Sequence, residues 1–440
     1  MSFSELVRRV DMFQSTGSSG YSNGYHPDGG SGGGAHVAGH RLRRGSRSRS
    51  RDHGSVTNVR VSTRMIQQQQ EETGTDKAPT PCTDFDMAYF NSYAHLGIHE
   101  EMIKDRARTE SYRNAIFLHQ DRIAGKVVVD VGCGTGILSI FCARAGAKRV
   151  YAVDASNIAV QANEVVKANN LSDTVIVLHG RVEDVEIDEE VDVIVSEWMG
   201  YMLLYESMLG SVITARERWL KPGGLILPST ATLYMAPVTH PDRYSESVDF
   251  WRNVYGIDMS AMLPLAKQCA FEEPSVETIS GENVLTWPHV VKQVDCYTVT
   301  LHELESVSTR FKFKSMMRAP FQGFAFWFDV EFGIPAIFPA NNNTKAAFVE
   351  PPNNHDIVGN QRKKRANPNE ALVLSTAPED PPTHWQQTLI YFYDPIEVEQ
   401  DQVIEGSVTL SQSKENPRFM NIHLEYASNG RHFVKESVMR

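Results

Sequence analysis

Runs of apolar residues change character along the chain, and the change falls near Pro228. From Lys126, the stretch KVVVDVGCGTGILSIFCARAGAKRVYAVDAS has the pattern of a buried strand, a glycine-rich turn, a helix and a second buried strand. The runs TVIVLHG, VDVIVSEW and GGLILPS continue this alternation of strands with helix-forming segments. The pattern predicts an α/β domain with a doubly wound parallel sheet over residues 122–228.

The chain after Pro228 contains short runs rich in Val, Thr, Tyr and Phe, such as ATLYMAPV, DCYTVTL, GFAFWFDVEF and VIEGSVTLSQ. They predict antiparallel β structure, a barrel or a sandwich, over residues 229–440. Two segments interrupt these runs. Residues 239–271 are strongly apolar with a helical pattern, whereas residues 338–369, rich in Asn and Pro, predict a long exposed insertion.

The N-terminal segment, residues 1–80, carries Gly and Ser tracts, the arginine-serine run RLRRGSRSRSR and the run QQQQ. A segment of this composition buries too little apolar surface to offset the entropy of ordering, so we predict a disordered tail. Its arginine run either contacts RNA or a receptor, or is simply solvated. Residues 81–121, which follow, predict a helical segment ahead of the parallel sheet.

Length and composition restrict the class of protein. The 440 residues are enough for two or three domains. No apolar run approaches the roughly 18 residues of a membrane helix, and the N-terminus lacks a secretory signal, so we expect an intracellular protein. The five cysteines are odd in number and have no CxxC spacing, which argues against a disulfide framework and against a zinc site. We expect no bound metal.

Charge is distributed unevenly along the chain. Residues 1–60 hold nine Arg against four acidic residues, and the remainder carries a net charge of −16. An acidic body attracts cationic partners and repels the phosphates of nucleic acids. We therefore expect no nucleic acid on the catalytic body, although a charge that only keeps the protein soluble would have the same sign.

A glycine-rich turn, VDVGCGTG, places Gly132 and Gly134 at the carboxyl end of the first strand, where backbone can approach a cofactor closely. Its G-x-G-x-G spacing differs from the dinucleotide fingerprint, and Asp130 precedes the glycines. This acid suits a cofactor with an amino group and a sulfonium, as in S-adenosylmethionine enzymes. Asp154 ends the second strand, where it would bond ribose hydroxyls, and Glu183 would accept from the adenine amino group. The alternative is a tight turn capped by acids.

Two glutamates, Glu197 and Glu206, lie nine positions apart in the otherwise apolar and aromatic stretch SEWMGYMLLYESML. Burying an unpaired carboxylate is costly, so a buried pair implies a cationic partner. That partner is a structural Arg or Lys, a metal ion or a positively charged substrate.

The stretch SEWMGYMLLYESML resembles the double-glutamate loop of the protein arginine methyltransferases. Three other blocks are similar to the same family: YFNSYAHLGIHEEMIKDRART, VVVDVGCGTGIL and PPTHWQQT. The likeness runs from about Asp84 to the C-terminus except for the insertion, and is nearest to the type I, arginine methyltransferase six-like branch in its plant form. It implies a Rossmann-type domain joined to a β-barrel near Pro228, N-terminal helices that close over S-adenosylmethionine, and a helical dimerisation arm at residues 239–271.

The resemblance also implies catalytic roles. An arginine side chain is always protonated and its lone pairs are delocalised, so it is a poor nucleophile. Glu197 and Glu206 would hold the guanidinium by charge-assisted hydrogen bonds and offset its repulsion from the sulfonium. His384, paired with Asp105, would accept the proton that the product loses, unless solvent or a glutamate does so.

Further residues follow from the same resemblance. His99 and Arg108 would contact the cofactor, Arg108 at its carboxylate, while Asp154 stands where the family commonly has Glu. The residues expected around the target nitrogen are Tyr93, Met102, Tyr201, Met208 and Trp385. Because Met102, Asp105 and Arg108 recur at three-residue spacing, we also predict that they share one face of a helix after Gly97.

The function implied is that of a type I protein arginine N-methyltransferase, which forms mono- and asymmetric dimethylarginine in proteins, with histone tails among the candidate substrates. The rivals are a methyltransferase for RNA or a small molecule and a coactivator scaffold without activity. The acidic body and the two glutamates disfavour the first, and the intact set of site residues disfavours the second. We expect a homodimer, and the basic run Arg362–Arg365 predicts a nuclear location, with the cytoplasm as a second one.

Overall fold

The computed structural model describes residues 82–333 and 372–440, which belong to one of the two units into which the chain divides. The predicted tail (residues 1–80), the predicted insertion (residues 338–369) and the basic run Arg362–Arg365 lie outside the described residues. Those predictions therefore remain predictions.

In the part of the chain described from residue 82 onward, four helices precede the first strand: α2 Asp84–Tyr93, α3 Leu96–Lys104, α4 Arg106–Leu118 and α5 Gln120–Ile123. The prediction that Met102, Asp105 and Arg108 share the face of one helix is wrong. The chain leaves the helical conformation at Asp105 (φ −66°, ψ 98°), which ends α3 and begins α4. The Asp105 side chain caps α4, because its Oδ1 accepts from the Arg108 N–H at 2.9 Å. No helix in the described ranges is long and apolar enough to cross a membrane.

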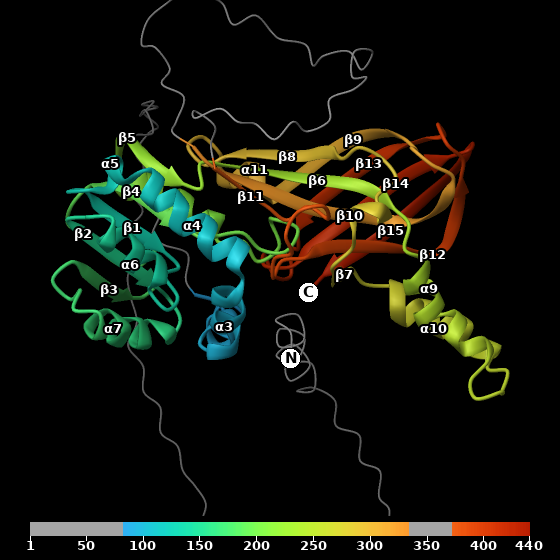
Figure 1. Ribbon diagram of the computed structural model, residues 1–440, viewed down its shortest axis with the longest axis horizontal. Coiled ribbons are helices and arrows are strands. Elements are labelled where there is room, and N and C mark those ends of the chain that lie inside the picture. Colours follow the sequence, from blue (N-terminus) through green and yellow to red (C-terminus); the bar gives the residue numbers. More distant parts are fainter. Residues whose placement is uncertain (1–81, 334–371) are drawn as a thin grey trace, which may run out of the picture. The chain divides into compact units, whose positions relative to one another are not determined.

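A five-stranded sheet follows, and all of its pairings are parallel. Its order is β3-β2-β1-β4-β5, and Figure 1 shows it with its helices at the left. The order reverses between β1 and β4, where ligands of such sheets bind at the carboxyl ends. The prediction of a doubly wound α/β domain is confirmed. The elements are β1 Val127–Val131, α6 Ile137–Arg144, β2 Arg149–Asp154, α7 Ile158–Ala168, β3 Val175–His179, β4 Val191–Ser196, α8 Leu209–Trp219 and β5 Leu220–Leu227.

The second half forms two antiparallel sheets, of order β7-β12-β10-β6-β8, with β11 beside β10, and β15-β14-β13-β9. Phe324 of β10 joins them, since its ring meets those of Phe311 on β9 and Tyr426 on β14 at 5.3 and 5.8 Å. The predicted antiparallel domain is confirmed. The strands are β6 Thr230–Val238, β7 Ser275–Glu277, β8 His289–Asp295, β9 Ser306–Lys314, β10 Ala319–Phe332, β11 Leu372–Ser375, β12 Gln387–Val398, β13 Val403–Gln412, β14 Met420–Ser428 and β15 Arg431–Met439.

One predicted strand in this half is wrong. The run DCYTVTL, residues 295–301, has alternating β-branched residues, but β8 ends at Asp295. A turn follows, in which the N–H of Val299 donates to the Asp295 carbonyl at 2.9 Å. The helix α11, Leu301–Glu305, then begins at a capping box formed by Thr300 and Glu303. Local capping outweighs β propensity here.

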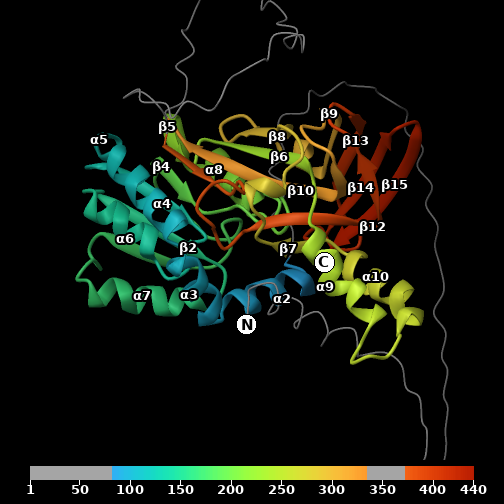
Figure 2. The ribbon, with the colours of Figure 1, turned by 45° about the vertical axis from the view of Figure 1, so that its right-hand side comes forward.

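The apolar segment 239–271 is helical but in pieces: α9 Pro241–Ser247, η1 Asp249–Arg252, η2 Ser260–Met262 and α10 Leu263–Phe271. It projects from the β domain on the side away from the parallel sheet (Figures 1 and 2). Its base is fixed, because Lys435 donates to the Phe271 carbonyl at 2.7 Å and Tyr244 stacks on Phe271. Its tip leaves Phe250, Tyr255 and Ile257 51%, 100% and 62% exposed.

Candidate active site

The loop after β4 carries both glutamates and is tightly folded. The N–H of Gly200 donates to the Leu203 carbonyl at 3.1 Å, and the N–H of Met208 donates to the Trp198 carbonyl at 2.9 Å. A Cβ added to Gly200 would lie 1.6 Å from the Tyr205 carbonyl oxygen, so only glycine fits. Three residues without glycine's freedom have left-handed φ angles: Met202 (50°), Leu203 (65°) and Glu206 (54°). Such backbone strain is typical of functional loops.

Glu197 has a cationic partner within the chain. The Nε and Nη2 atoms of Arg108 each lie 3.0 Å from its Oε2, and the side chains are 7% and 8% exposed. The third nitrogen, Nη1, donates to the Met102 carbonyl at 3.3 Å. Of the partners considered for a buried carboxylate, a structural arginine is therefore the one present for Glu197.

Glu206 contacts helix α2 through its backbone. Its backbone carbonyl accepts from the Tyr89 hydroxyl at 3.5 Å, and the Tyr89 ring lies 4.7 Å from that of Tyr93. Burial raises the pKa of Tyr93 well above its usual value. The charges of nearby groups, Glu206 and Glu197 among them, add to this effect. The charges of both glutamates thus act on Tyr93.

His384 and Asp105 form a buried pair. Asp105 Oδ2 accepts from the His384 Nδ1–H at 2.7 Å and from the His384 backbone N–H at 2.9 Å. Burial would raise the pKa of Asp105, but the hydrogen bonds from His384 and from the Arg108 N–H hold it below the usual value. An ionised Asp105 keeps the proton of His384 on Nδ1, which leaves Nε2 as an acceptor.

The glycine turn lies directly against the double-glutamate loop. Gly132 and Gly134 have φ angles of 73° and 53°, and a Cβ on Gly132 would lie 2.2 Å from Met208 Cε. Met208, expected at the target nitrogen, is thus also in contact with the glycine turn. The N–H of Gly134 donates to Asp154 Oδ2 at 2.8 Å, so the acid at the end of β2 fixes this turn.

Asp130 is buried without full hydrogen bonding. It is 0% exposed, and its Oδ2 accepts from the Ser139 hydroxyl at 2.6 Å. Among the residues that the structure describes, none donates a hydrogen bond to its Oδ1. Burial raises the pKa of Asp130 to about 7, and the Asp154 charge adds to this against the opposing Ser139 hydrogen bond. An orphaned carboxylate oxygen at a ligand crevice suits a cationic group.

The remaining cofactor candidates, His99 and Glu183, contact this turn and α8, respectively. His99 donates from Nε2 to the Tyr93 carbonyl at 2.7 Å, and burial lowers the pKa of His99, which makes it neutral at pH 7. A Cβ on Gly134 would lie 3.1 Å from the His99 ring. Glu183 Oε1 accepts from the Ser211 hydroxyl of α8 at 2.9 Å.

The other substrate candidates are mostly packed. Tyr201 and Trp385 are 7% and 4% exposed, and the Trp385 indole N–H donates to the Met199 carbonyl at 3.1 Å. The Trp385 ring also packs against His384, at 3.9 Å between ring centroids. Trp385 therefore ties the loop of His384 to the double-glutamate loop.

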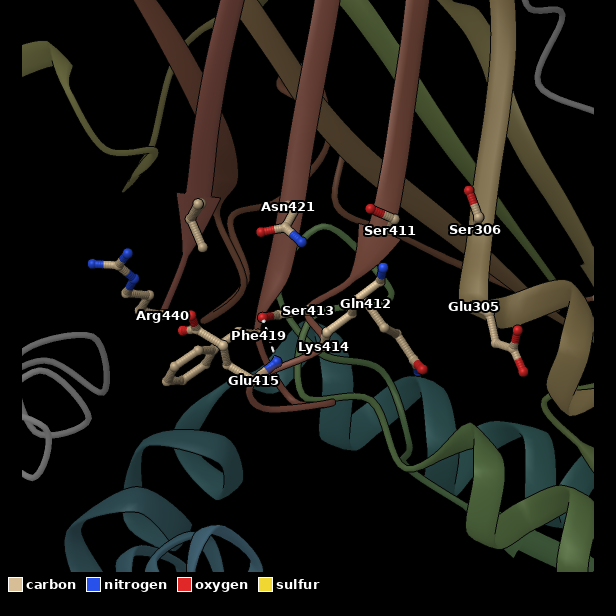
Figure 3. A pocket seen from close by; sticks show the side chains of 11 residues that line it. Glu305, Ser306, Ser411, Gln412, Ser413, Lys414, Glu415, Phe419, Asn421 and Arg440 are labelled. Carbon is tan, nitrogen blue, oxygen red and sulfur yellow. Dashed lines mark hydrogen bonds between the residues drawn. The ribbon is translucent and has the colours of Figure 1, made fainter.

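A cavity of about 700 Å³ lies at one end of the four-stranded sheet (Figure 3). It is lined by polar residues of β9, β13 and the loop after β13, among them Ser306, Ser411 and Glu415. None of the site residues predicted from the sequence is among the described residues that line it.

Sequence reasoning missed Asp86 and Arg418, two residues that hold helix α2 beside the double-glutamate loop. Arg418, in the loop after β13, forms an ion pair with Asp86 of α2 at 2.7 Å and lies over the Tyr89 ring. The only signal for Asp86 was its capping-box position three residues after Thr83, which predicts a helix start. Nothing in the sequence near Arg418 indicated a contact with a segment more than 300 residues away.

Comparison with known proteins decides the family. The chain is 74% identical over 403 residues to "Probable protein arginine N-methyltransferase 6" of Arabidopsis thaliana, an alignment that covers 91% of this chain and 92% of that protein. The chain belongs to the protein arginine N-methyltransferase family. It is therefore an enzyme that methylates arginine side chains of proteins, and the family predicted from the sequence motifs is confirmed.

Family models and solved structures agree with this assignment. The model "Arginine methyltransferase oligomerization subdomain" matches residues 229–338 and 363–431, and the model "Ribosomal protein L11 methyltransferase" matches residues 116–229. A Trypanosoma brucei PRMT1 enzyme-prozyme heterotetrameric complex with AdoHcy is 33% identical, with a TM-score of 0.67 over 80% of this chain and 100% of that chain. Arabidopsis thaliana protein arginine methyltransferase 10 is 34% identical, with a TM-score of 0.64 over the same shares.

Proposed function

We propose that this methyltransferase is a type I enzyme, which forms monomethylarginine and then asymmetric dimethylarginine in basic protein segments, with histone tails as candidate substrates. The observation that carries the proposal is the double-glutamate loop, in which Arg108 holds the buried Glu197 and Met208 contacts the glycine turn, while the charges of both glutamates act on Tyr93. Two carboxylates in a largely buried site favour a cationic substrate, and the aromatic and methionine side chains around them restrict its shape.

The methyl donor in this proposal is S-adenosylmethionine, which supplies an electrophilic methyl group on a sulfonium. The residues present fit it. The orphaned Oδ1 of Asp130 would receive its ammonium group, Arg108 its carboxylate, Asp154 a ribose hydroxyl and Glu183 its adenine amino group. Asp154 already accepts from Gly134 at Oδ2 and from the N–H and hydroxyl of Ser156 at Oδ1. A carboxylate has about four acceptor sites, so one ribose hydroxyl can still bind at Oδ2.

The two glutamates would have unequal roles in holding the substrate guanidinium. Arg108 fixes the orientation of Glu197 and offsets part of its charge. Both carboxylates would orient one terminal nitrogen and offset the repulsion between the two cations. His384 would accept the product's proton at Nε2, while Asp105 stabilises the imidazolium that results.

The type I assignment rests on the methionines beside the target nitrogen. Met208 contacts the glycine turn, and the Met102 carbonyl accepts from Arg108, which supports a position for both residues near the donor and the acceptor. Such crowding would allow a second methyl group on the nitrogen that is already methylated, but would keep the other terminal nitrogen away from the donor. Chromatography of hydrolysed histone after methylation tests this. Asymmetric dimethylarginine is the expected product, and the symmetric isomer alone would overturn the assignment.

Replacing either member of the buried pair, by His384→Ala or Asp105→Ala, should lower turnover. The double variant should be little worse than the worse single variant, because residues that act as a unit are non-additive. Initial rates of methyl transfer to a histone peptide measure this. His423→Ala, which breaks an exposed pair with Glu436 on the β domain, is the control. Multiplicative losses would show that the two residues act separately.

We also propose that the chain forms a homodimer through the segment 239–271, which projects from the β domain with an exposed apolar tip. The Phe250→Ser/Ile257→Ser variant should be monomeric and should lose affinity for S-adenosylmethionine and turnover together, because a partner's arm would steady the helices at the cofactor. Light scattering and calorimetry measure both. Trp287→Ser, at a side chain 69% exposed outside this segment, is the control. A folded monomer with full activity would contradict the proposal.

Cofactor affinity should depend on pH through Asp130, whose pKa is about 7. The cofactor's ammonium group would favour the ionised form, so affinity should rise from pH 6 to 7.5, by up to about tenfold per unit below the pKa. Above about pH 8 the amino group of the cofactor itself loses its proton and the gain should end. Calorimetry with wild type and Asp130→Asn measures this. The variant should lack the rise, and a flat wild-type profile would exclude Asp130 from the contact.

A nuclear location is proposed on the basis of the basic run Arg362–Arg365. A fluorescent fusion of the whole chain should concentrate in nuclei. The same fusion with these four residues replaced by Ser should not, and an unchanged distribution would contradict the proposal.

A further inference from the structure

The loop between β13 and β14, residues 413–419, holds the N-terminal helix α2. Arg418 donates from Nη2 and Nε to Asp86 Oδ1, at 2.7 and 3.2 Å. Its guanidinium carbon also lies 3.7 Å from the centroid of the Tyr89 ring, within the range of a cation–π interaction. A single arginine of the β domain thus contacts two successive turns of α2.

Asp86 serves the helix and the arginine at the same time. Its other oxygen, Oδ2, accepts from the N–H and the hydroxyl of Thr83 at 3.0 and 2.8 Å, which completes the capping box of α2. The Arg418 and Asp86 side chains are 20% and 25% exposed, so water and salt screen this pair less than a surface pair. A second contact supports this pair. The rings of Phe419 and Phe85 pack edge to face, with their centroids 6.3 Å apart.

Helix α2 also contacts residues proposed for catalysis and cofactor binding. Tyr89 donates to the Glu206 carbonyl at 3.5 Å. The Tyr93 carbonyl accepts from His99 Nε2 at 2.7 Å and from the Ser156 hydroxyl at 3.5 Å. Figure 2 shows α2 in blue next to α3. The placement of α2 therefore sets the relation between the Glu206 loop and the cofactor side of the site.

We propose that Arg418 is a positioning residue that fixes α2 against the active site, and that residues 413–419 thereby couple the β domain to cofactor binding. This inference rests on the roles proposed above for His99 and Glu206. The same loop forms part of the wall of the 700 Å³ cavity through Ser413, Lys414 and Glu415 (Figure 3). A polypeptide bound in that cavity would touch the loop that holds α2.

Arg418→Ala should raise the KM for S-adenosylmethionine about tenfold and change kcat less than about threefold, since it removes a charge-assisted pair and a cation–π contact without touching the reacting groups. Amide hydrogen exchange in residues 84–93 should become about tenfold faster, while exchange in β1 stays the same. Arg418→Lys, which keeps the charge but loses the planar fork, should recover part of both effects. Arg431→Ala is the matched control, because Arg431 lies 5.9 Å from the Phe433 ring on β15.

An active Arg418→Ala enzyme with unchanged KM and unchanged exchange in residues 84–93 would overturn the proposal, as would an equal rise in KM for Arg431→Ala. Should the alanine variant fail to fold, Arg418→Gln keeps the polar contact without the charge and gives the same comparison. Should the wild-type chain show no methyl transfer from S-adenosylmethionine, the proposed function fails. The exchange experiment would still decide whether Arg418 holds α2.

Discussion

Glu206→Gln is expected to lower methyl transfer by at least about 10²-fold, the usual effect of losing one preorganised electrostatic partner. The substitution removes a charge and keeps the shape of the side chain. Tyr89 bonds the backbone carbonyl of Glu206 and not its carboxylate, so the strained loop should keep its conformation. Affinity for S-adenosylmethionine should stay within about twofold, because Glu206 is proposed to contact the substrate cation only. Initial rates with an arginine peptide and calorimetry of the cofactor measure the two quantities.

The matched control is Glu405→Gln. Glu405 is a half-exposed glutamate of β13 that pairs with Lys312, and its loss should leave the rates at the wild-type level. Calorimetric loss of cofactor binding in folded Glu206→Gln would place this carboxylate at the cofactor instead. Unimpaired turnover would remove Glu206 from catalysis altogether.

The two halves of the fold could be predicted because each has a hydrophobic period of its own. All five residues of β1 are buried, and so its sequence VVVDV has no polar alternation apart from Asp130. That exception marks a candidate cofactor position, since a buried acid with an orphaned oxygen breaks the pattern of a core strand. The run DCYTVTL misled because a strand and a capped turn both tolerate Thr and Val, and the distinction came from Thr300 and Glu303.

The contacts within the site were less accessible from the sequence. Family motifs indicated which side chains gather and that His384 pairs with Asp105, as the structure shows, but they did not indicate the partner of Glu197. That Arg108 meets Glu197, 89 positions away, depends on the break at Asp105, which turns α4 relative to α3. The Arg418 contact with α2 depends on the register of β13 with β14, which no local sequence pattern reveals. Pairings set by tertiary geometry leave no local signal.

Arg108→Ala is expected to have a large effect on stability as well as on activity. The Arg108 and Glu197 side chains are 7% and 8% exposed, so the change leaves Glu197 as a buried carboxylate without its cationic partner. Breaking a buried ion pair by removing one partner typically costs about 3–5 kcal/mol. The variant should also lose most of its affinity for S-adenosylmethionine, whose carboxylate Arg108 is proposed to hold. Arg106→Ala, at an exposed arginine of the same helix that pairs with Glu110, should leave the free energy of unfolding nearly unchanged, because solvent screens this pair.

The double variant Arg108→Met/Glu197→Gln separates the two effects. With both charges gone, no unpaired ion remains in the site, and replacing a buried ion pair by neutral groups is often close to neutral in stability. Urea denaturation should therefore show the free energy of unfolding restored to within about 2 kcal/mol of wild type. Methyl transfer should stay at least about 10²-fold below wild type, because one substrate carboxylate and the cofactor's cationic partner are both missing. A double variant as unstable as Arg108→Ala would show that the loss comes from packing of the arginine stem and not from the stranded charge of Glu197.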